Sequence, residues 1–379
     1  MKITKENTRL LPCPILNRHL LSYLVATAIT AALALPAGAQ ENNLEANAAK
    51  VPTNTVIATV PLSGTPGFLV VNPDDTFVYV VTYVSSSTSY VISQIDTTTR
   101  AVVTFPLAGQ ASGLAVTPNG QQLYVGLNVS AAGAVAILDA STGTLINTID
   151  LSGGPNLLQI SPDGKYAYVP MATGSGSDVI VIDTATQKVK KTIPVTSFPD
   201  AVSVVFNRSG SIAYVTGFNL LSGAGSVAEI DTATLKVTHT VSVDAFTIYS
   251  IVNLTTNDVW TVGSNNVWTI GPSGGGFNAI NVIKGGKVII TAAPPAGVSF
   301  GFPAFTPNGK YAYMPEAYLN GSTSNYVYLT DTKTCLPVGT PIQVGNEPYF
   351  VQIAHNGKYA YVANQVDDTV TVIQISPAQ

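Results

Sequence analysis

The side chains best able to do chemistry in this chain of 379 residues are few and scattered. An imidazole can act as a general base or bind a metal, and a thiolate can act as a nucleophile. Beyond the first 40 residues the chain has only His239, His355 and Cys335 of these types, with no His-x-His or His-Glu-x-x-His pattern. We therefore predict structural roles: His239 in an exposed outer strand, His355 in a turn, and Cys335 as an unpaired surface or half-buried thiol.

Serine and carboxylate chemistry is equally sparse. Residues 271–275 spell Gly-Pro-Ser-Gly-Gly, but a nucleophile of this type needs a strand-to-helix turn, and no helix-forming segment follows. Calcium needs carboxylates at loop spacing. The adjacent acidic pairs, residues 74–75 and 367–368, are explained more simply as solvated turns. The sequence therefore predicts no catalytic residue, no metal site and no cofactor.

The elements that hold these residues follow an N-terminal leader. Residues 1–39 contain four basic residues, an apolar run over residues 20–35, and Ala-Gly-Ala at residues 37–39. This is the pattern of a secretory signal peptide cleaved after Ala39. The alternative, a membrane anchor, needs a run of about 20 apolar residues, and this run is shorter. We expect a signal peptide over 1–39, a linker over 40–53, and a periplasmic or extracellular location.

The composition after cleavage excludes several classes of protein. The leader removes four of 17 basic and one of 21 acidic residues, which leaves 340 residues with a net charge of −7. Such a chain is a poor nucleic-acid binder, because that binding depends on Lys and Arg. A single cysteine excludes an intramolecular disulfide. We predict a monomer with no transmembrane segment after cleavage, whose partner is an unknown envelope protein, peptide or glycan.

A short motif recurs seven times over residues 54–379: a turn followed by alternating Tyr and Val. The clearest copy, residues 162–169, is Pro-Asp-Gly-Lys-Tyr-Ala-Tyr-Val. Successive aromatic anchors are 44 to 53 residues apart; they are Tyr79, Tyr124, Tyr168, Tyr214, Trp260, Tyr313 and Tyr361. This spacing is typical of propeller blades of about 40–50 residues. The period-2 alternation and the Pro and Gly turns argue against a helical repeat.

A second motif lies between the anchors, and its best copy is Val-Ile-Asp-Thr-Ala-Thr at residues 181–186. We interpret its Asp as the cap of a hairpin turn rather than as a ligand. Each repeat thus supplies four short strands, except that the last supplies three, while residues 54–61 form a strand without a blade. We predict an all-β fold: a seven-bladed β-propeller with four-stranded blades, closed by the N-terminal strand completing the last blade.

These motifs, with Tyr-Val-Thr-Gly at residues 214–217 and Tyr-Val-Ala-Asn at 361–364, resemble the YVTN β-propeller repeat family. That family includes YncE-like periplasmic proteins and surface-layer proteins. The resemblance covers about residues 54–379 and implies the fold, but propellers of this kind include binding proteins, lactonases and lyases. The fifth repeat departs from the pattern, since Trp260 and Trp268 replace tyrosines and Gly271 stands where the turn Asp is expected. We interpret residues 272–276 and 284–287 there as extra turns.

A ligand of such a ring would bind at the mouth where the chain enters the inner strands. The loops that enter these strands and the loops between second and third strands meet at that mouth. They carry Asn and aromatic side chains suited to hydrogen bonding and stacking. The alternative is that the Asn residues only satisfy turn geometry. The candidate ligand-binding residues are Tyr83, Asn128, Asn156, Asp200, Phe218, Asn219, Glu316, Tyr318, Glu347 and Asn364.

Two functions are open on this basis. The first is a non-enzymatic binding scaffold in the cell envelope. The second is a hydrolase or lyase acting on a lactone or uronic sugar, with Glu316, Glu347 and Asp200 as its carboxylates. General acid–base catalysis needs such groups close together in a pocket. Converging carboxylates at the mouth would favour the enzyme, and amides and aromatic rings alone would favour the scaffold.

Overall fold

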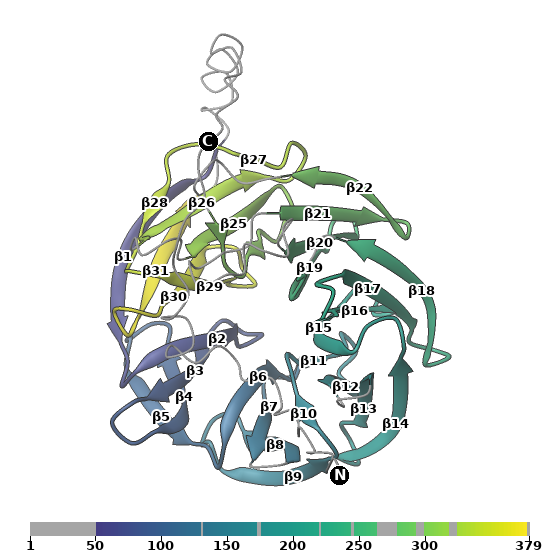
Figure 1. Ribbon diagram of the computed structural model, residues 1–379. Coiled ribbons are helices and arrows are strands. Elements are labelled where there is room, and N and C mark those ends of the chain that lie inside the picture. Colours follow the sequence, from purple (N-terminus) through teal and green to yellow (C-terminus); the bar gives the residue numbers. More distant parts are fainter. Residues whose placement is uncertain are drawn as a thin grey trace, which may run out of the picture.

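The computed structural model describes residues 51–129, 132–172, 176–219, 221–243, 246–263, 279–292, 299–317 and 324–376. Every regular element in these ranges is a β-strand. Seven antiparallel sheets stand around one axis, which confirms the seven-bladed propeller (Figure 1). The predicted signal peptide and most of the linker lie outside the described residues. The part of the chain that is described contains no helix able to cross a membrane.

Each blade places its first strand nearest the axis and its fourth at the periphery (Figure 1). Blades 1 to 3 contain β2 (Thr65–Val71), β3 (Phe77–Val84), β4 (Ser89–Asp96), β5 (Val102–Pro106); β6 (Gln110–Val116), β7 (Gln122–Val129), β8 (Ala132–Asp139), β9 (Leu145–Leu151); and β10 (Gly154–Pro155), β11 (Gln159–Ile160), β12 (Tyr166–Ala172), β13 (Ser177–Asp183), β14 (Lys188–Val195). Blades 4 and 5 contain β15 (Asp200–Phe206), β16 (Ile212–Phe218), β17 (Gly225–Asp231), β18 (Lys236–Val243); and β19 (Tyr249–Asn253), β20 (Asp258–Gly263), β21 (Ala279–Lys284), β22 (Lys287–Ala292). Blades 6 and 7 contain β23 (Ser299–Phe300), β24 (Ala304–Phe305), β25 (Tyr311–Ala317), β26 (Tyr326–Asp331), β27 (Leu336–Pro337), β28 (Ile342–Gln343); and β29 (Pro348–Ile353), β30 (Tyr359–Asn364), β31 (Thr369–Ser376), β1 (Thr53–Pro61).

The first strands of blades 3 and 6 are each divided into two short strands. The backbone at each break turns to the next blade instead of to its own. Leu157 N–H donates to the carbonyl of Val202 at 3.0 Å, and Phe302 N–H donates to that of Tyr349 at 2.8 Å. A backbone group that leaves its own ladder must find another partner when it is buried. These breaks therefore join neighbouring blades close to the axis.

The seven predicted anchors form the core between blades. Each lies in the second strand of its blade, and the most exposed, Tyr214, keeps only 7% of its surface. Their rings pack on the next blade: Tyr168 contacts Phe206 edge-on at 5.0 Å, and Trp260 contacts Phe305 at 5.1 Å. Burial of a side chain of this size contributes about 2–3 kcal/mol. The recurring aromatic residue therefore stabilises the packing between adjacent blades.

The turn motifs have the structural role that we expected. In blade 3, the Asp183 carboxylate accepts the Thr186 N–H at 2.9 Å and its hydroxyl at 3.0 Å. These bonds lower the pKa of the Asp183 carboxyl, with the amide bond the larger cause. The Thr184 hydroxyl donates to the Gly164 carbonyl at 2.6 Å, which ties the turn between third and fourth strands to the turn between first and second strands. The recurring Asp is a turn cap, not a ligand.

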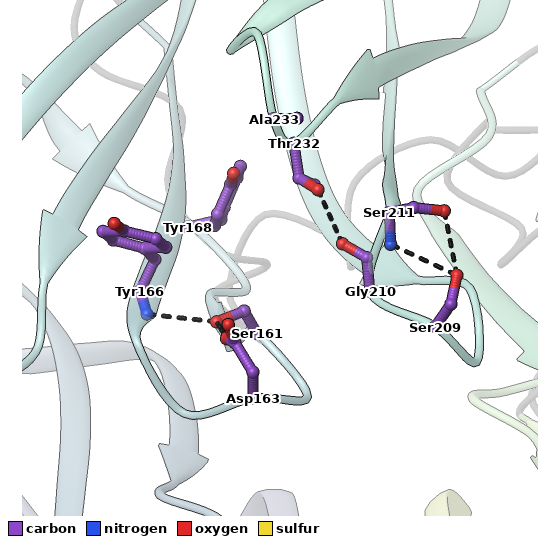
Figure 2. A pocket seen from close by; sticks show the side chains of 9 residues that line it. All are labelled: Ser161, Asp163, Tyr166, Tyr168, Ser209, Gly210, Ser211, Thr232 and Ala233. Carbon is purple, nitrogen blue, oxygen red and sulfur yellow. Dashed lines mark hydrogen bonds between the residues drawn. The ribbon is translucent and has the colours of Figure 1, made fainter.

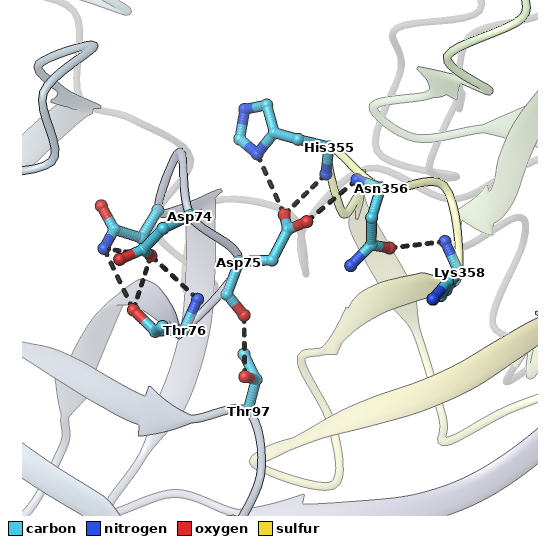
Figure 3. A network of polar contacts seen from close by, with 8 residues as sticks. Asp74, Asp75, Thr76, Thr97, His355, Asn356 and Lys358 are labelled. Carbon is cyan, nitrogen blue, oxygen red and sulfur yellow. Dashed lines mark hydrogen bonds and ion pairs between the residues drawn. The ribbon is translucent and has the colours of Figure 1, made fainter.

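Several contacts between the first and last parts of the ring close it, among them a bond of 2.9 Å from the Thr65 hydroxyl to the Asp368 carboxylate. The predicted N-terminal strand is β1, which forms eight antiparallel pairs with β31 as the outermost strand of blade 7 (Figure 1). Another contact joins blades 1 and 7 on the turn side of the ring (Figure 3). There the Asp75 carboxylate accepts the N–H groups of His355 at 2.7 Å and Asn356 at 2.9 Å, and lies 3.1 Å from the His355 imidazole.

Blade 5 corrects one prediction. Residues 284–287 are not an extra turn, because β21 and β22 are the third and fourth strands and residues 285–286 are the ordinary hairpin turn between them. Gly285 and Gly286 have φ values of +55° and +72°. Such left-handed values suit a two-residue hairpin, so glycine geometry replaces the Asp cap used elsewhere. Trp260 is the buried anchor as predicted, while Trp268, Gly271 and residues 272–276 lie outside the described residues.

Candidate binding site at the mouth face

The strand directions divide the surface of the ring into two faces. The loops that enter the first strands, and those between second and third strands, lie on one face, here called the mouth face. The turns between first and second strands, and between third and fourth strands, lie on the opposite face, here called the turn face. The sequence-predicted site residues all come from mouth-face segments. The structure places each of them there except Tyr318, which lies outside the described residues.

Aromatic side chains close the mouth end of the central channel. Phe68 of β2, Tyr249 of β19, Phe302 of blade 6, and Tyr349 and Phe350 of β29 form one continuous cluster. Tyr249 lies 4.8 Å and Phe68 5.9 Å from Phe302, measured between ring centroids. Leu157, from blade 3, packs on the same cluster. We call this set the aromatic floor. Because its members come from blades on several sides of the axis, the channel is blocked there by side chains.

Three members of the aromatic floor, Phe68, Tyr249 and Tyr349, are only partly buried. Burial raises the pKa of the Tyr249 and Tyr349 hydroxyls well above the usual range, so both phenols stay neutral. Sequence analysis did not select these residues. A usable signal was present, because an aromatic residue stands near the start of the first strand in blades 1, 5 and 7 and at the strand break of blade 6.

The predicted aromatic residues each pair with a neighbour at the rim. Tyr83 contacts Tyr90 across β3 and β4 at 5.0 Å, and Phe218 contacts Phe246 at 5.5 Å. All four are half-buried, so one side of each pair still meets solvent. Aromatic pairs of this kind are rigid and amphipathic, which suits them to contact a ligand. Their binding role stays a prediction.

The predicted asparagines are engaged in the fold. Asn219 accepts the N–H groups of Leu221 and Ser222 at 2.9 and 3.1 Å, which is a turn cap. Asn156 donates to the carbonyl of Ala201 in the next blade at 2.7 Å. The Asn128 side-chain oxygen lies so close to Gly154 that a Cβ there would approach it to 2.6 Å. Asn219 thus caps its own turn and Asn156 bonds the next blade, and a role of these residues in ligand binding stays a prediction.

The candidate carboxylates share the mouth face but come from different blades. Glu316 is near the end of β25 in blade 6, and Glu347 precedes β29 in blade 7. Asp200 begins β15 in blade 4 and pairs across to Phe218. Blade 5 therefore separates Asp200 from the other two. Glu316 and Glu347 are the pair that adjacent blades could bring toward one ligand.

A polar corner forms around Glu347 where blades 6, 7 and 1 meet. The Glu347 N–H donates to the Ser324 carbonyl at 2.7 Å, and Gln365 N–H donates to the Glu347 carbonyl at 2.9 Å. Asp367 accepts two bonds from Asn346, at 2.7 and 2.9 Å, one from its N–H and one from its amide. We call residues 345–347, Ser324 and residues 364–368 the acidic corner. Its backbone is fixed by these bonds, so its carboxylates are held in place.

Asn364 lies beneath the acidic corner and is fully buried. Its amide nitrogen donates to the hydroxyls of Thr369 and Thr371 on β31, at 3.0 and 2.8 Å. The Asn364 side-chain oxygen and the buried Ser324 hydroxyl have no hydrogen-bond partner among the described residues. Unpaired buried acceptors are uncommon and call for a donor.

The remaining chemistry-bearing side chains lie away from the mouth. His355 is in the turn-face contact of Figure 3, and His239 is in β18 with its ring 3.0 Å from the Gly286 carbonyl. Cys335 is more buried than predicted, at 4% exposed, and burial raises the pKa of its thiol to about 11. Ser273 lies outside the described residues. Within the described residues, no three His, Cys, Asp or Glu side chains come together as a metal site.

The turn face has a shallow hollow of about 210 Å³ between blades 3 and 4, shown in Figure 2. Its polar atoms already bond one another: Ser161 accepts the Tyr166 N–H at 3.0 Å, and Ser209 and Ser211 share a bond of 2.8 Å. The Tyr168 hydroxyl at its base is buried, which raises its pKa to about 12. Apart from the Tyr168 hydroxyl, which has no hydrogen-bond partner among the described residues, the polar groups of the hollow are occupied in turns, and we take the mouth face as the candidate site.

Comparison with known proteins shows the fold alone. No family model matches the chain, and no curated protein sequence matches it. Hydrazine synthase from Kuenenia stuttgartiensis has a similar structure, with a TM-score of 0.67 and 22% identity, over 83% of this chain and 96% of that one. The β-propeller domain of Cps50 (Swd1) from Myceliophteria thermophila matches with a TM-score of 0.67 and 10% identity, over 86% and 100%. The chain is therefore similar to propellers of different functions, one from an enzyme's structure.

Proposed function

We propose that this chain is an exported YVTN-type propeller that binds an envelope component at its mouth face, as a scaffold that does not convert what it binds. The observation that carries the proposal is the aromatic floor. Its rings meet across the axis of the ring, and Phe68, Tyr249 and Tyr349 are only partly buried. A partly exposed aromatic cluster surrounded by polar loops is the usual anatomy of a binding surface.

The distribution of reactive groups supports binding over turnover. On the turn face, His355 bonds Asp75 and Cys335 is buried, while His239 belongs to an outer strand. None of them therefore faces a ligand at the mouth. A lactonase or lyase would have to use Glu316 and Glu347 alone, because Asp200 is two blades away from Glu316. Export is supported by the basic residues, apolar run and Ala-Gly-Ala site of residues 1–39.

The test is to capture partners with a chain whose mouth is blocked. In a Cys13→Ser background, Val366→Cys places a thiol on an exposed loop of the mouth face, and Lys165→Cys places one on the exposed turn face. Because Cys335 is buried, only the introduced thiol should accept a polyethylene-glycol maleimide.

Capture from envelope extract should be lost when residue 366 carries the polymer and kept when residue 165 carries it. Equal capture by both labelled chains would contradict a mouth-face site. Turnover of a lactone or uronic sugar by the unlabelled chain, abolished in Glu316→Gln, would replace the scaffold by the enzyme. Mass spectrometry of exported chain should find Gln40 at its N-terminus.

A further inference from the structure

We propose that the ligand of the mouth face is a multivalent organic cation whose alkylammonium groups bind at the acidic corner and over the aromatic floor. This inference rests on the proposed function, since it assigns a chemical class to the ligand of the same face. An alkylammonium group can come from a free polyamine or from the lysine side chains of a polypeptide. Both sources share the chemistry argued here, and the experiment separates them.

The first observation is a segregation of charge along the ring axis. Residues 51–379 contain twelve Lys and Arg, and each lies in a turn-face connection or in the adjoining half of a third or fourth strand. They are Arg100, Lys165, Lys188, Lys190, Lys191, Arg208, Lys236, Lys284, Lys287, Lys310, Lys333 and Lys358. In sequence, no connection on the mouth face contains a Lys or an Arg.

Carboxylates occur on both faces, so only the Lys and Arg residues are segregated. On the mouth face, carboxylates occur at the ends of the strands and in the loops there. Those of the described residues are Asp150, Asp178, Asp200, Glu316, Glu347, Asp367 and Asp368. Without basic side chains among them, their potentials add over the whole face. A surface of one sign attracts ligands of the other sign and repels its own. The mouth face therefore favours a cation and disfavours an anion such as a phosphate, a nucleic acid or an acidic glycan.

The second observation is that two buried groups of the acidic corner are unpaired among the described residues, the acceptor oxygen of Asn364 and the hydroxyl of Ser324. An ammonium group has three donors and no acceptor, so it complements a site made of oxygen acceptors. A glycan hydroxyl would bring both a donor and an acceptor. The corner thus lacks the kind of group that an alkylammonium supplies.

The third observation is that the aromatic floor adjoins these groups. Tyr349 is two residues from Glu347 and stacks edge-on against Phe302 at 4.9 Å. An ammonium over an aromatic face gains about 0.5–2 kcal/mol, more as it is desolvated. Calcium would not use this face of the ring, since it requires several carboxylates around one point. Separated carboxylates and aromatic faces instead suit a cation whose charges are spread along a chain.

The experiment is isothermal titration of the full-length chain with spermine and with an acetylated hexalysine peptide, in about 20 mM salt to limit screening. A hexaglutamine peptide is the neutral control. Glu347→Gln removes one charge at the acidic corner without changing side-chain size. Glu229→Gln removes one charge from the middle of β17, remote from the mouth face. Thermal unfolding of each variant verifies that it is folded.

We expect both cations to bind. At low salt, Glu347→Gln should raise the Kd about fivefold, and Glu229→Gln should leave the Kd unchanged. Binding of spermine alone would assign a polyamine, and binding of the peptide alone would assign a lysine-rich partner. Equal weakening by both variants would overturn the inference, since net charge alone would then explain binding. If neither cation binds while polymer-sensitive capture persists, the cation class is wrong and the mouth-face function stands.

Discussion

The contact between blades 1 and 7 in Figure 3 permits a quantitative test of how the ring is held closed. The Asp75 carboxylate accepts two backbone N–H groups of the last blade, from His355 and Asn356, with its two different oxygens. Asp75→Asn keeps one acceptor oxygen and replaces the other by an NH₂ group. Asp75 has a φ of +61°, a left-handed value that Asn also adopts readily, so the substitution adds no backbone strain.

The size of the effect follows from the bonds that change. One charge-assisted bond is lost, and the N–H that made it then faces another donor instead of an acceptor. A hydrogen bond to a charged group contributes about 1.5–3 kcal/mol, and an orphaned donor costs about 1–3 kcal/mol if it is buried. The Asp75 side chain is 14% exposed, so water relieves part of the second cost. We expect the free energy of unfolding to fall by about 2 kcal/mol.

Scanning calorimetry should show a Tm lower by roughly 3–6 °C, and amide exchange at His355 and Asn356 should accelerate. Asp163→Asn is the matched control, because Asp163 bonds only within its own turn in blade 3, to Ser161, to the Lys165 N–H and, in an exposed ion pair at 3.2 Å, to the Lys165 ammonium. Asn occupies the same turn position in other blades, so the control should be nearly neutral. A Tm loss in the control as large as that in Asp75→Asn would refute the role assigned to the contact between blades.

Three further predictions concern ionisation. The turn bonds lower the pKa of carboxyls such as Asp183. The contribution of these carboxyls to stability is therefore present above about pH 4 and is lost as pH falls through the folded pKa. The Tm should drop steeply only below about pH 4. Burial raises the pKa of Tyr124 and Tyr168 to about 12. Their contribution to the free energy of unfolding is therefore complete below about pH 10 and is lost toward about pH 12. Absorbance at about 295 nm should show phenolates appearing only as the protein unfolds. Burial also raises the pKa of Cys335 to about 11, so in Cys13→Ser a disulfide reagent at about pH 8 should label it slowly when native and rapidly in denaturant.

The sequence was sufficient for the fold because the information that builds a blade is local. The second strands Tyr166–Ala172 and Tyr359–Asn364 each follow a Pro or His turn that fixes their start, and the alternating pattern fixes their faces. Residues 284–287 were interpreted wrongly because Gly285 and Gly286 form a two-residue turn, whereas the corresponding turn of blade 3 spans residues 184–187 and is capped by Asp183. Both turns join a third strand to a fourth, but they differ in length and in residue type.

The site was harder to predict because it depends on contacts between distant repeats. Phe68 and Tyr249 are each ordinary strand residues in sequence, and only closure of the ring brings both onto Phe302. The loop asparagines are ambiguous in sequence for a related reason. An amide in a loop looks the same whether it caps its own turn, as Asn219 does, or bonds the next blade, as Asn156 does.

The repeat accounts for one half of the charge segregation and not for the other. Lys165, Lys310 and Lys358 occupy the same place in the turn between first and second strands, so the repeat itself puts positive charge on the turn face. The repeat does not determine which residues occur in the mouth-face loops, because these loops differ in length and sequence from blade to blade. Their shared lack of Lys and Arg is therefore a property of this chain that neither turn chemistry nor packing requires. The proposed cationic ligand would account for it, because basic side chains around its site would repel that ligand.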